Sequence, residues 1–300
     1  TVSRPIFPKG LEGLGDYIIS DLKINGEFIS SLTLSALKNK RDQISYIFYP
    51  NQEALKTSFL LGQTSQIVGV IDPKILQIDL ANSSNVQADK NTDYSQLVTL
   101  FFNTKDQVLS DNKLRKGLSY ALPDSFTQGE RAYLPYAPTS IYYNKDAISH
   151  TQDLAHAKLL IDASYSSASV SASQVLTLKT LEKYQTVAQQ LAKVWRSLGV
   201  KTKIVVVDSR PDSFQMYLGD FTVPEDPDQY MLWHSDQESN ITKFVSLRID
   251  KLLEDGRKTA DIAVRKKIYA DFQKYLLDDA VIDTPASFLY FPYTYTITRH

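Results

Sequence analysis

The segment from Leu181 to Val207 constrains the fold most, because a periodic helix runs directly into a β-branched strand. The strand is Lys201–Val207. Thr180 is expected to cap the start of the helix and Gly199 its end. Between them, apolar residues recur at about 3.6 positions, namely at Tyr184, Val187, Ala188, Leu191, Val194, Trp195 and Leu198. A helix followed at once by such a strand predicts a layered α/β domain.

Residues 1–72 carry the pattern of a small β/α unit. Aromatic and β-branched runs bounded by Gly, Asn and Asp predict three strands, at Tyr17–Ile19, Phe28–Leu37 and Ile44–Tyr49. A helix is predicted at Gln52–Leu61, where Asn51 can cap the start and Gly62 the end. A short apolar strand at Gln66–Ile71 follows this helix.

The rest of the chain alternates between further strands and helices. Residues 73–96 are polar and rich in turn residues, so we interpret them as a crossing between two lobes. The remaining predicted elements are a buried strand at Leu97–Asn103, a helix that begins at Ser110 or Asp111 and stops at Pro123, amphipathic helices at Arg248–Arg257 and Ile262–Leu277, and an aromatic strand at Phe288–Thr298.

Composition excludes several classes of function. The 300 residues are 43% hydrophobic and 22% charged, which allows a full core. The net charge is -1 and basic residues are spread evenly, so no nucleic-acid partner is expected. The chain has no cysteine, and its four histidines form no metal-binding spacing, so neither a metal nor a cofactor is expected.

Membrane crossing is not expected either. The apolar runs are far shorter than the roughly 18 residues that a membrane helix needs. The first residue is Thr1 and no signal segment opens the chain. We therefore expect a processed product or an excised fragment, with any membrane anchor outside these residues.

The stretch DPDQYMLWHS, Asp226–Ser235, is the main candidate for a ligand-facing wall. Tyr230, Trp233 and His234 are amphipathic rings that suit an apolar pocket with hydrogen-bonding groups. Ligand contact and core packing remain open alternatives for Trp233. Asp226 and Asp228 are good turn residues, and a secreted hydrolase that uses both carboxylates is a second hypothesis.

Five segments, in order, resemble the family 5 extracellular solute-binding proteins, the peptide, dipeptide and nickel receptors of ABC importers. The most specific is LFFNTKDQVLSDNKLRKGLSYALP, Leu100–Pro123. The block Ala54–Val70 is similar to a helix-plus-glycine block of the family, but carries Thr64-Ser65-Gln66 where the family has an acidic residue. The other segments are Gly13–Ile19, Asp226–Ser235, and the helix pair Ile249–Asp261 and Arg265–Ala280.

The resemblance implies a fold and a domain plan. The fold would be α/β and periplasmic-binding-protein-like, of the type II clam-shell kind, with mixed sheets flanked by helices. Residues 1–72 would be a partial lobe-one segment, because the family's N-terminal part of lobe one is absent before Thr1. Residues 73–290 would form the second lobe, and residues 291–300 a strand that returns toward lobe one.

The resemblance also implies a function. The chain would not be an enzyme; it would bind a solute, in the first place an oligopeptide, between two lobes for an ABC importer. The full protein would be an extracellular or periplasmic lipoprotein at the cell surface, monomeric, with ABC permease subunits as partners. The same fold occurs as the ligand-sensing domain of regulators, which is the alternative function.

The ligand site implied by the resemblance involves the loop after the Gly219-Asp220-Phe221 segment. Oligopeptide-binding members hold the amino terminus of the peptide with an aspartate there, but its usual offset falls on Val223. Asp220, Glu225 or Asp226 are open substitutes. The candidate ligand-binding residues are Asp226, Tyr230, Trp233 and His234, with Asn103 near the hinge and Asn240 supporting the loop.

Overall fold

The chain forms two compact units. The computed structural model describes residues 3–6, 10–13, 15–147, 151–166, 173–277 and 284–300. The first unit comprises Thr1–Asn91 and Thr294–His300, and the second comprises Thr92–Tyr293. The chain therefore passes between the units twice, between Asn91 and Thr92 and between Tyr293 and Thr294.

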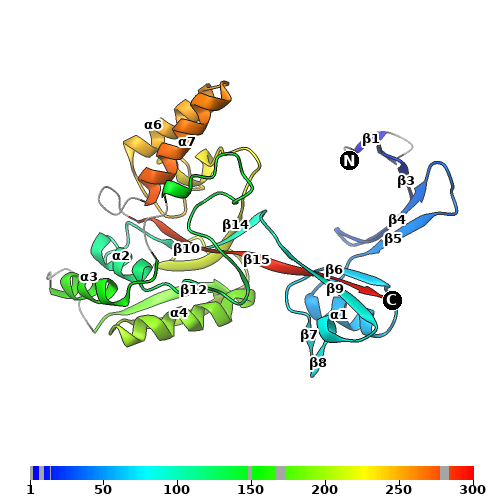
Figure 1. Cartoon of the computed structure of the whole chain (residues 1–300), viewed down its shortest axis with the longest axis horizontal. Helices are drawn as coiled ribbons and strands as arrows, with labels where there is room; N and C mark the ends of the chain where they lie inside the picture. The colour runs from blue at the N-terminus through cyan, green and yellow to red at the C-terminus, as the bar shows by residue number, and fades with distance from the viewer. Residues whose placement is uncertain (1–2, 7–9, 14, 148–150, 167–172, 278–283) are drawn as a thin grey trace. The chain divides into compact units, whose positions relative to one another are not determined.

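A mixed sheet forms the centre of the second unit (Figure 1). Its order is β11-β15-β10-β14-β12-β13. Neighbours are antiparallel except that β12 is parallel to both β13 and β14. The strands are β10 (Gln96–Phe102), β11 (Gly129–Arg131), β12 (Val175–Leu181), β13 (Lys201–Val207), β14 (Met216–Thr222) and β15 (Ala286–Arg299). This sheet and its flanking helices confirm the predicted layered α/β fold.

Helices cover both faces of this sheet (Figure 1). On one face lie α2 (Asn112–Tyr120), α3 (Leu154–Ser166) and α4 (Gln185–Ser197), and on the other α6 (Leu247–Lys258) and α7 (Ile262–Leu277). Alternate residues of β10 serve the two faces, because side chains of a strand alternate: Val98, Leu100 and Phe102 pack toward α2, α3 and α4, whereas Leu97 and Phe101 pack toward α6 and α7.

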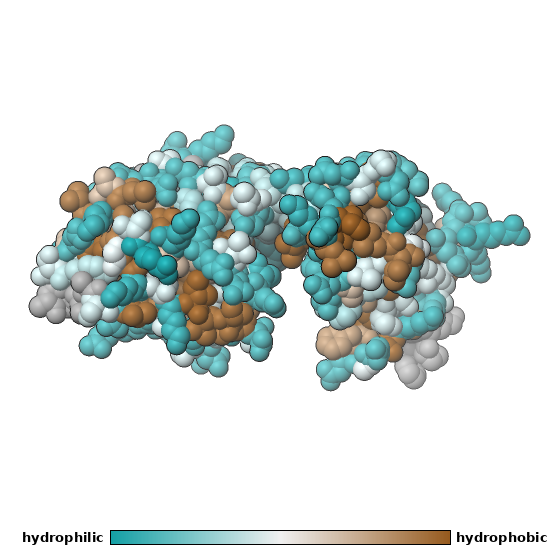
Figure 2. All heavy atoms as spheres, turned by 90° about the horizontal axis from the view of Figure 1, so that it is seen from below, coloured by the Kyte–Doolittle hydropathy of each residue, from teal (hydrophilic) through white to brown (hydrophobic). Residues whose placement is uncertain are grey.

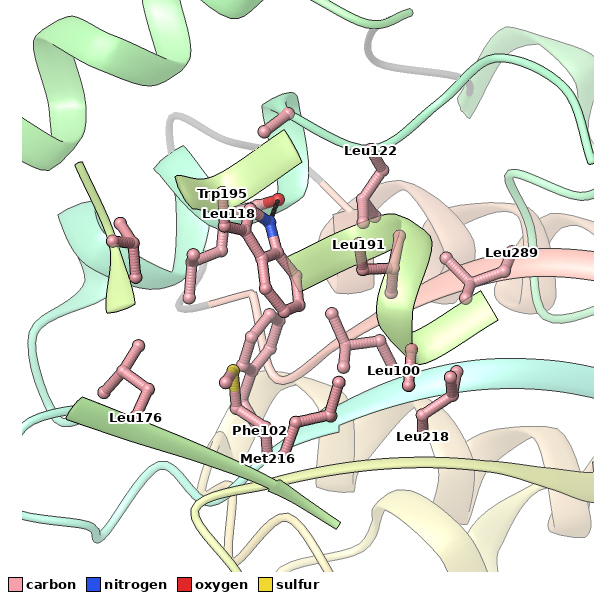
Figure 3. Packing of buried hydrophobic residues seen from close by; sticks show 14 of the residues in the cluster. Leu100, Phe102, Leu118, Leu122, Leu176, Leu191, Trp195, Met216, Leu218 and Leu289 are labelled. Carbon is pink, nitrogen blue, oxygen red and sulfur yellow. Dashed lines mark hydrogen bonds between the residues drawn. The ribbon is translucent and has the colours of Figure 1, made fainter. Parts of the chain in front are cut away.

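Trp195 lies at the centre of the core under α4 (Figure 3). It is 0% exposed, and its indole Nε1 donates a hydrogen bond to the carbonyl oxygen of Leu118, 3.0 Å away. Leu118 belongs to the last turn of α2, where carbonyl groups lack a helical donor. One side chain of α4 thus fills the core and also satisfies the end of α2.

The predicted start of this helix at Leu181 is wrong. Strand β12 continues to Leu181, a 3₁₀ turn spans Glu182–Tyr184, and α4 begins only at Gln185. Thr180 caps nothing, because it is buried in β12 and its hydroxyl donates to the carbonyl oxygen of Leu218 on β14. Pairing of Leu181 with Val207 of β13 thus extends β12 into a segment whose local pattern indicated helix.

The other predicted helices are present with small changes of boundary. Asp111 is the N-cap of α2 and accepts from the backbone N–H of Lys113 at 2.8 Å. The short helix α5 (Tyr230–Trp233), the helix α3, the strands β11 and β12, and a 3₁₀ turn at Lys145–Ala147 were not predicted.

The first unit is built around α1 (Gln52–Leu60), which Asn51 caps as predicted through a hydrogen bond from the N–H of Ala54 at 2.8 Å. Its core residues are Phe59, Ile67, Val70, Leu80 and Ile297. The strands are β1 (Ser3–Ile6), β2 (Gly10–Gly13), β3 (Tyr17–Asn25), β4 (Phe28–Ala36), β5 (Gln43–Ile47), β6 (Gln66–Val70), β7 (Lys74–Ile75), β8 (Ile78–Asp79) and β9 (Val86–Thr92), with a 3₁₀ turn at Leu80–Asn82.

The units divide later than the expected boundary near residue 72. Residues 73–91 belong to the first unit. The reason is packing, since Leu80 is 2% exposed in the same core as Phe59, and Val86 packs against that core. The end of β15 also lies in this unit, where Ile297 pairs with Ile67 of β6.

A three-stranded sheet in the first unit has one apolar face. In the order β3-β4-β5, Leu22, Leu32 and Tyr46 lie opposite one another, whereas Asp21, Thr33 and Ser45 form a polar row. Leu22 and Tyr46 are 37% and 47% exposed, so the apolar face is open within the described residues. Hydrophobic side chains also gather in patches on the surface drawn in Figure 2.

Candidate functional site

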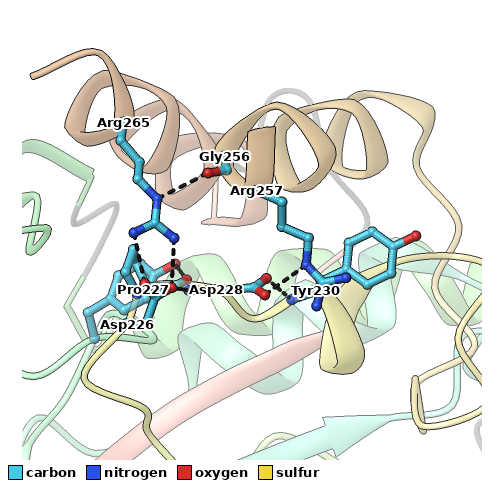
Figure 4. Close-up of polar contacts among 8 residues, drawn as sticks. Asp226, Pro227, Asp228, Tyr230, Gly256, Arg257 and Arg265 are labelled. Carbon is cyan, nitrogen blue, oxygen red and sulfur yellow. Dashed lines mark hydrogen bonds and ion pairs between the residues drawn. The ribbon is translucent and has the colours of Figure 1, made fainter. Parts of the chain in front are cut away.

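Two ion pairs hold the acidic turn after β14 against α6 and α7 (Figure 4). Arg265 donates to both oxygens of Asp226, at 2.7 and 2.8 Å. Arg257 Nε donates to Asp228 at 2.7 Å. Within the turn, Asp226 accepts from the N–H of Asp228 at 2.9 Å, and Asp228 from the N–H of Tyr230 at 3.0 Å. Both aspartates are therefore turn residues engaged with arginines.

In the pair of Arg265 and Asp226, each side chain shifts the pKa of the other. The guanidinium of Arg265 lowers the pKa of the Asp226 carboxyl below its ordinary value. The same hydrogen bonds raise the pKa of Arg265, so the pair stays ionised at neutral pH. Asp226 is 56% exposed, and solvent therefore screens much of the attraction.

We expect the pair of Arg265 and Asp226 to stabilise the second unit at neutral pH but not at strongly acidic pH. The folded-state pKa of Asp226 is depressed, so the stabilisation is present above its unfolded pKa, about 4, and is lost as the pH falls through the folded value. Asp226→Asn should lower the free energy of unfolding at neutral pH by up to about 1 kcal/mol. The difference from the unsubstituted chain should vanish in acid. Urea unfolding across pH measures it, and the exposed Asp212→Asn is the control.

Tyr230 and His234 pack against α6. Their rings are stacked with centroids 4.1 Å apart, and the guanidinium carbon of Arg257 lies 3.9 Å from the Tyr230 centroid. His234 is 4% exposed, and its Nδ1 accepts from the N–H of Asp236 at 3.2 Å. Its Nε2 lies 3.6 Å from a carboxylate oxygen of Glu254. The imidazole therefore faces protein on both nitrogens.

Trp233 packs in the core under α6 and α7. Its side chain is 0% exposed and meets Phe288 edge-on, with centroids 6.1 Å apart. The indole Nε1 donates to Gln229 Oε1 at 2.9 Å, and Gln229 Nε2 donates to the carbonyl oxygen of Pro135 at 2.7 Å. Of the two alternatives for Trp233, this environment is that of core packing.

The candidate residues Asn240 and Asn103 lie in different loops, and each bonds to the backbone of its surroundings. Asn240 is 2% exposed and braces its loop, because Nδ2 donates to the carbonyl oxygen of Phe244 at 2.8 Å and Oδ1 accepts from Thr242 at 2.7 Å. Asn103 Nδ2 donates to the carbonyl oxygen of Phe214 at 3.0 Å. Asn103 follows the last residue of β10, whereas the crossing at Asn91–Thr92 precedes its first residue. This position differs from the expected place near the hinge.

A hollow of about 460 Å³ opens beside the acidic turn, within the second unit. Three segments line it: the connection from β9 to β10, the loop after β11, and the residues that follow β14. We call it the β14 pocket. Its lining residues are Tyr94, Ser95, Tyr136, Ala137, Thr139, Ser140, Ile141, Tyr142, Val223, Pro224 and Glu225.

Hydrogen bonds join the walls of the β14 pocket. The N–H of Val223 donates to the carbonyl oxygen of Ser95 at 2.8 Å. The hydroxyl of Tyr136 donates to the carbonyl oxygen of Pro227 at 2.7 Å. Tyr136 is 1% exposed, and burial raises the pKa of its hydroxyl well above the ordinary value, so it remains a donor. These bonds tie the turn after β14 to both other segments.

Glu225 carries the one carboxylate in the lining of the β14 pocket. Across the described ranges it makes no hydrogen bond and no ion pair, in contrast to its neighbours Asp226 and Asp228. Tyr94, another lining residue, gives its hydroxyl hydrogen bond to Glu130 at 2.8 Å. Glu225 is thus an available anion beside hydroxyl and aromatic groups, an arrangement that suits a cationic or hydrogen-bonding ligand.

None of the six candidate residues from the sequence lines this pocket. Asp226 directly follows Glu225, a lining residue that was an open substitute for the amine anchor in the sequence analysis. Tyr94, Tyr136 and Tyr142 were missed. Their signal was only the excess of tyrosine, 18 in the chain, because nothing local distinguishes a tyrosine of a pocket from one of a core.

The model of the bacterial extracellular solute-binding proteins, family 5, middle part, matches residues 34–243. The chain belongs to this family. Three of the five segments that suggested it, at residues 54–70, 100–123 and 226–235, lie inside the match. The segments at residues 13–19 and 249–280 lie outside it. Proteins of this family bind solutes and are not enzymes.

Three solved structures of solute-binding proteins share the fold. The ABC transporter substrate-binding protein CtaP of Listeria monocytogenes matches 97% of this chain with a TM-score of 0.81 and 20% identity. The oligopeptide-binding protein AppA of Bacillus subtilis, in complex with a nonapeptide, matches 98% with a TM-score of 0.73 and 19% identity. NikZ of Campylobacter jejuni, in complex with nickel and L-histidine, matches 95% with a TM-score of 0.73 and 18% identity.

These matches confirm the periplasmic-binding-protein-like fold over nearly the whole chain. The chain spans 62% of CtaP, 63% of AppA and 62% of NikZ. No curated protein matches the sequence. None of the helices in the described ranges combines the length and apolar character that a bilayer crossing requires. In that same part of the chain, no group of three or more His, Cys, Asp and Glu side chains is placed to hold a metal ion.

Proposed function

We propose that this chain binds a peptide-like solute for an ABC importer, and that the β14 pocket contacts this solute. The observation that carries the proposal is the unpaired carboxylate of Glu225 in a hollow of about 460 Å³. A peptide offers an ammonium group and main-chain donors and acceptors. Glu225, the hydroxyl groups and the backbone at the end of β14 are complementary to these groups.

Glu225 takes the role of the amine anchor in this proposal. The expected aspartate position is occupied by Val223, which lines the pocket but has no charge. Asp226 and Asp228 are engaged with Arg265 and Arg257. Among the carboxylates of the turn, Glu225 is the one with a free side chain in the lining.

We propose the following setting for the complete protein. It acts outside the cytoplasmic membrane, anchored at the cell surface as a lipoprotein, and delivers its solute to ABC permease subunits as a monomer. The family description as extracellular supports the location, and the ABC-transporter relative CtaP supports the permease as partner. Because the chain spans 62% of CtaP, we expect weak binding by this chain alone.

Titration calorimetry with a pool of tetrapeptides tests the role of Glu225. Glu225→Gln should weaken binding of the pool about tenfold, which is the value of a hydrogen bond to a charged group. The same pool with acetylated amino termini should bind the unsubstituted chain and the variant equally. Acetylation removes the ammonium group with which the Glu225 carboxylate would pair, so the contribution of that ion pair is absent from the acetylated pool.

The exposed Glu238→Gln is the matched control, because Glu238 does not line the β14 pocket. It should leave binding unchanged. Equal weakening by both variants, or equal binding of free and acetylated pools to the unsubstituted chain, would refute an amine contact at Glu225.

The two alternative functions are a secreted hydrolase and the ligand-sensing domain of a regulator. The hydrolase that would use Asp226 and Asp228 is excluded by the family, and both carboxylates are bound to arginines. A ligand-sensing domain of a regulator would use the same fold and the same pocket. The upstream coding sequence separates it from a receptor, since a DNA-binding domain indicates the regulator and a lipid-anchor motif the receptor.

A further inference from the structure

Arg265 contacts Tyr142, which lines the β14 pocket, and Asp226, which follows the lining residue Glu225. Its guanidinium holds Asp226, the residue after Glu225, through two hydrogen bonds of 2.7 and 2.8 Å. The guanidinium carbon lies 5.8 Å from the ring centroid of Tyr142, which lines the pocket from the loop after β11. Its side chain is 18% exposed, so the contacts lie mostly inside the protein.

The position of Arg265 is itself fixed. Its Nε donates to the carbonyl oxygen of Gly256 on α6 at 3.0 Å (Figure 4). The guanidinium carbon also lies 5.4 Å from the ring centroid of Tyr269 on α7. A Cβ at Gly256 would lie 2.7 Å from the ring and hydroxyl of Tyr269, so α6 and α7 meet closely here. The arginine is therefore anchored on a packed helix pair.

The turn that Arg265 holds lies outside the helices and strands. Residues 223–229 lie between β14 and α5 and belong to neither. Several bonds fix their position: the N–H of Val223 donates to Ser95, and the carbonyl of Pro227 accepts from Tyr136. Gln229 bonds to Pro135 and Trp233, and the two aspartates form the ion pairs with the arginines. Arg265 makes the bidentate pair among these, and a planar guanidinium fixes direction as well as distance.

We propose that Arg265 is a positioning residue of the β14 pocket: it sets the place of Glu225 relative to Tyr142 without contacting the solute. The effect of Arg265 on solute affinity rests on the proposed function, whereas its effect on the turn does not. Lysine cannot replace it, since an ammonium forms no bidentate pair and stacks on no ring as a plane.

Hydrogen exchange of the chain without solute tests the positioning directly. Arg265→Met and Arg265→Lys should both speed the exchange of the Val223 and Asp228 amides several-fold, because these amides donate within the held turn. Amides of β12 and β13 should keep their rates. Arg248→Met is the matched control, since Arg248 contacts Tyr275 on α7 and does not line the pocket.

Unchanged exchange at Val223 and Asp228 in Arg265→Met would overturn the proposal. So would unchanged exchange in Arg265→Lys, because the positive charge alone would then suffice. Exchange that rises equally across the whole second unit, or equally in Arg248→Met, would also overturn it, since the role of Arg265 would then be general stability.

Calorimetry with the tetrapeptide pool then measures the consequence for binding. Both Arg265 variants should bind the pool about threefold to tenfold more weakly than the unsubstituted chain. In a Glu225→Gln background the same substitutions should weaken binding less, because the group being positioned is already neutral. Equal weakening in both backgrounds would overturn positioning of Glu225. Faster exchange together with no pool binding by the unsubstituted chain would support the positioning and refute the proposed function.

Discussion

Replacing Trp233 with alanine is expected to lower the free energy of unfolding of the second unit by about 3–5 kcal/mol. The indole is 0% exposed and packs edge-on against Phe288 of β15. Its removal opens a cavity and also leaves Oε1 of Gln229, itself 4% exposed, without the indole donor. Urea unfolding followed by far-ultraviolet circular dichroism measures the loss.

Met231 provides the matched control for Trp233, because it lies in the same short helix and is 56% exposed. Met231→Ala should change the free energy of unfolding by less than about 0.5 kcal/mol. A Trp233→Ala variant with unchanged stability and lost tetrapeptide binding would mean that the indole meets the solute. That result would favour ligand contact over core packing for Trp233.

Replacing Trp195 with alanine should cost about 3–5 kcal/mol as well, on the other face of the sheet. Trp195 is 0% exposed between α4 and the strands, and its Nε1 donates to the carbonyl oxygen of Leu118. Trp195→Phe keeps most of the ring and removes the donor. It should therefore cost about 1–3 kcal/mol, the penalty for an unsatisfied buried group.

Lys193 of α4 is the control for Trp195, since it is exposed in the same helix. Lys193→Ala should leave the free energy of unfolding within about 0.5 kcal/mol of the unsubstituted value. A Trp195→Phe variant as unstable as Trp195→Ala would show that the hydrogen bond to Leu118, and not the volume of the ring, dominates. Solute binding should follow the stability of the unit in both variants, because Trp195 does not line the β14 pocket.

The three carboxylates of the acidic turn, those of Glu225, Asp226 and Asp228, have different roles. Asp226 and Asp228 shape the turn and bind arginines of α7 and α6, which neutralises them. Glu225 keeps its charge free beside the pocket. Of the three acidic residues in the sequence of the turn, only Glu225 thus offers its negative charge to a solute. This charge is the reason why we expect a preference for a free amino terminus.

Periodicity was sufficient for many elements of the fold. The boundaries of α7 were predicted at Ile262–Leu277, and the caps Asn51 and Asp111 hold the helices they were expected to hold. Such features depend on interactions between residues a few positions apart, so one segment contains all the information. The family could be inferred for the same reason, because its motifs are contiguous stretches such as Leu100–Pro123.

Tertiary structure decided the features that depend on distant partners. Strand β12 was missed and α4 was started too early, because β12 depends on pairing with β13 and β14, and Leu181 itself pairs with Val207 of β13. The stretch Asp226–Ser235 was expected to form a ligand-facing wall, with contact and core packing both open for Trp233; in the structure Trp233 is in the core and His234 packs against α6. Whether an amphipathic ring is buried depends on which surface covers it, and no local pattern specifies that surface.

The same reason applies to the β14 pocket. Its walls come from Tyr94, from the loop around Tyr142 and from Glu225, which lie far apart in the chain. The local sequence specified the helices α1, α2, α6 and α7 and the acidic turn, since each arises from short-range spacing and turn chemistry. The convergence of three segments on one hollow, and the arginine of α7 that braces it, arises only from long-range packing of the helices on the sheet.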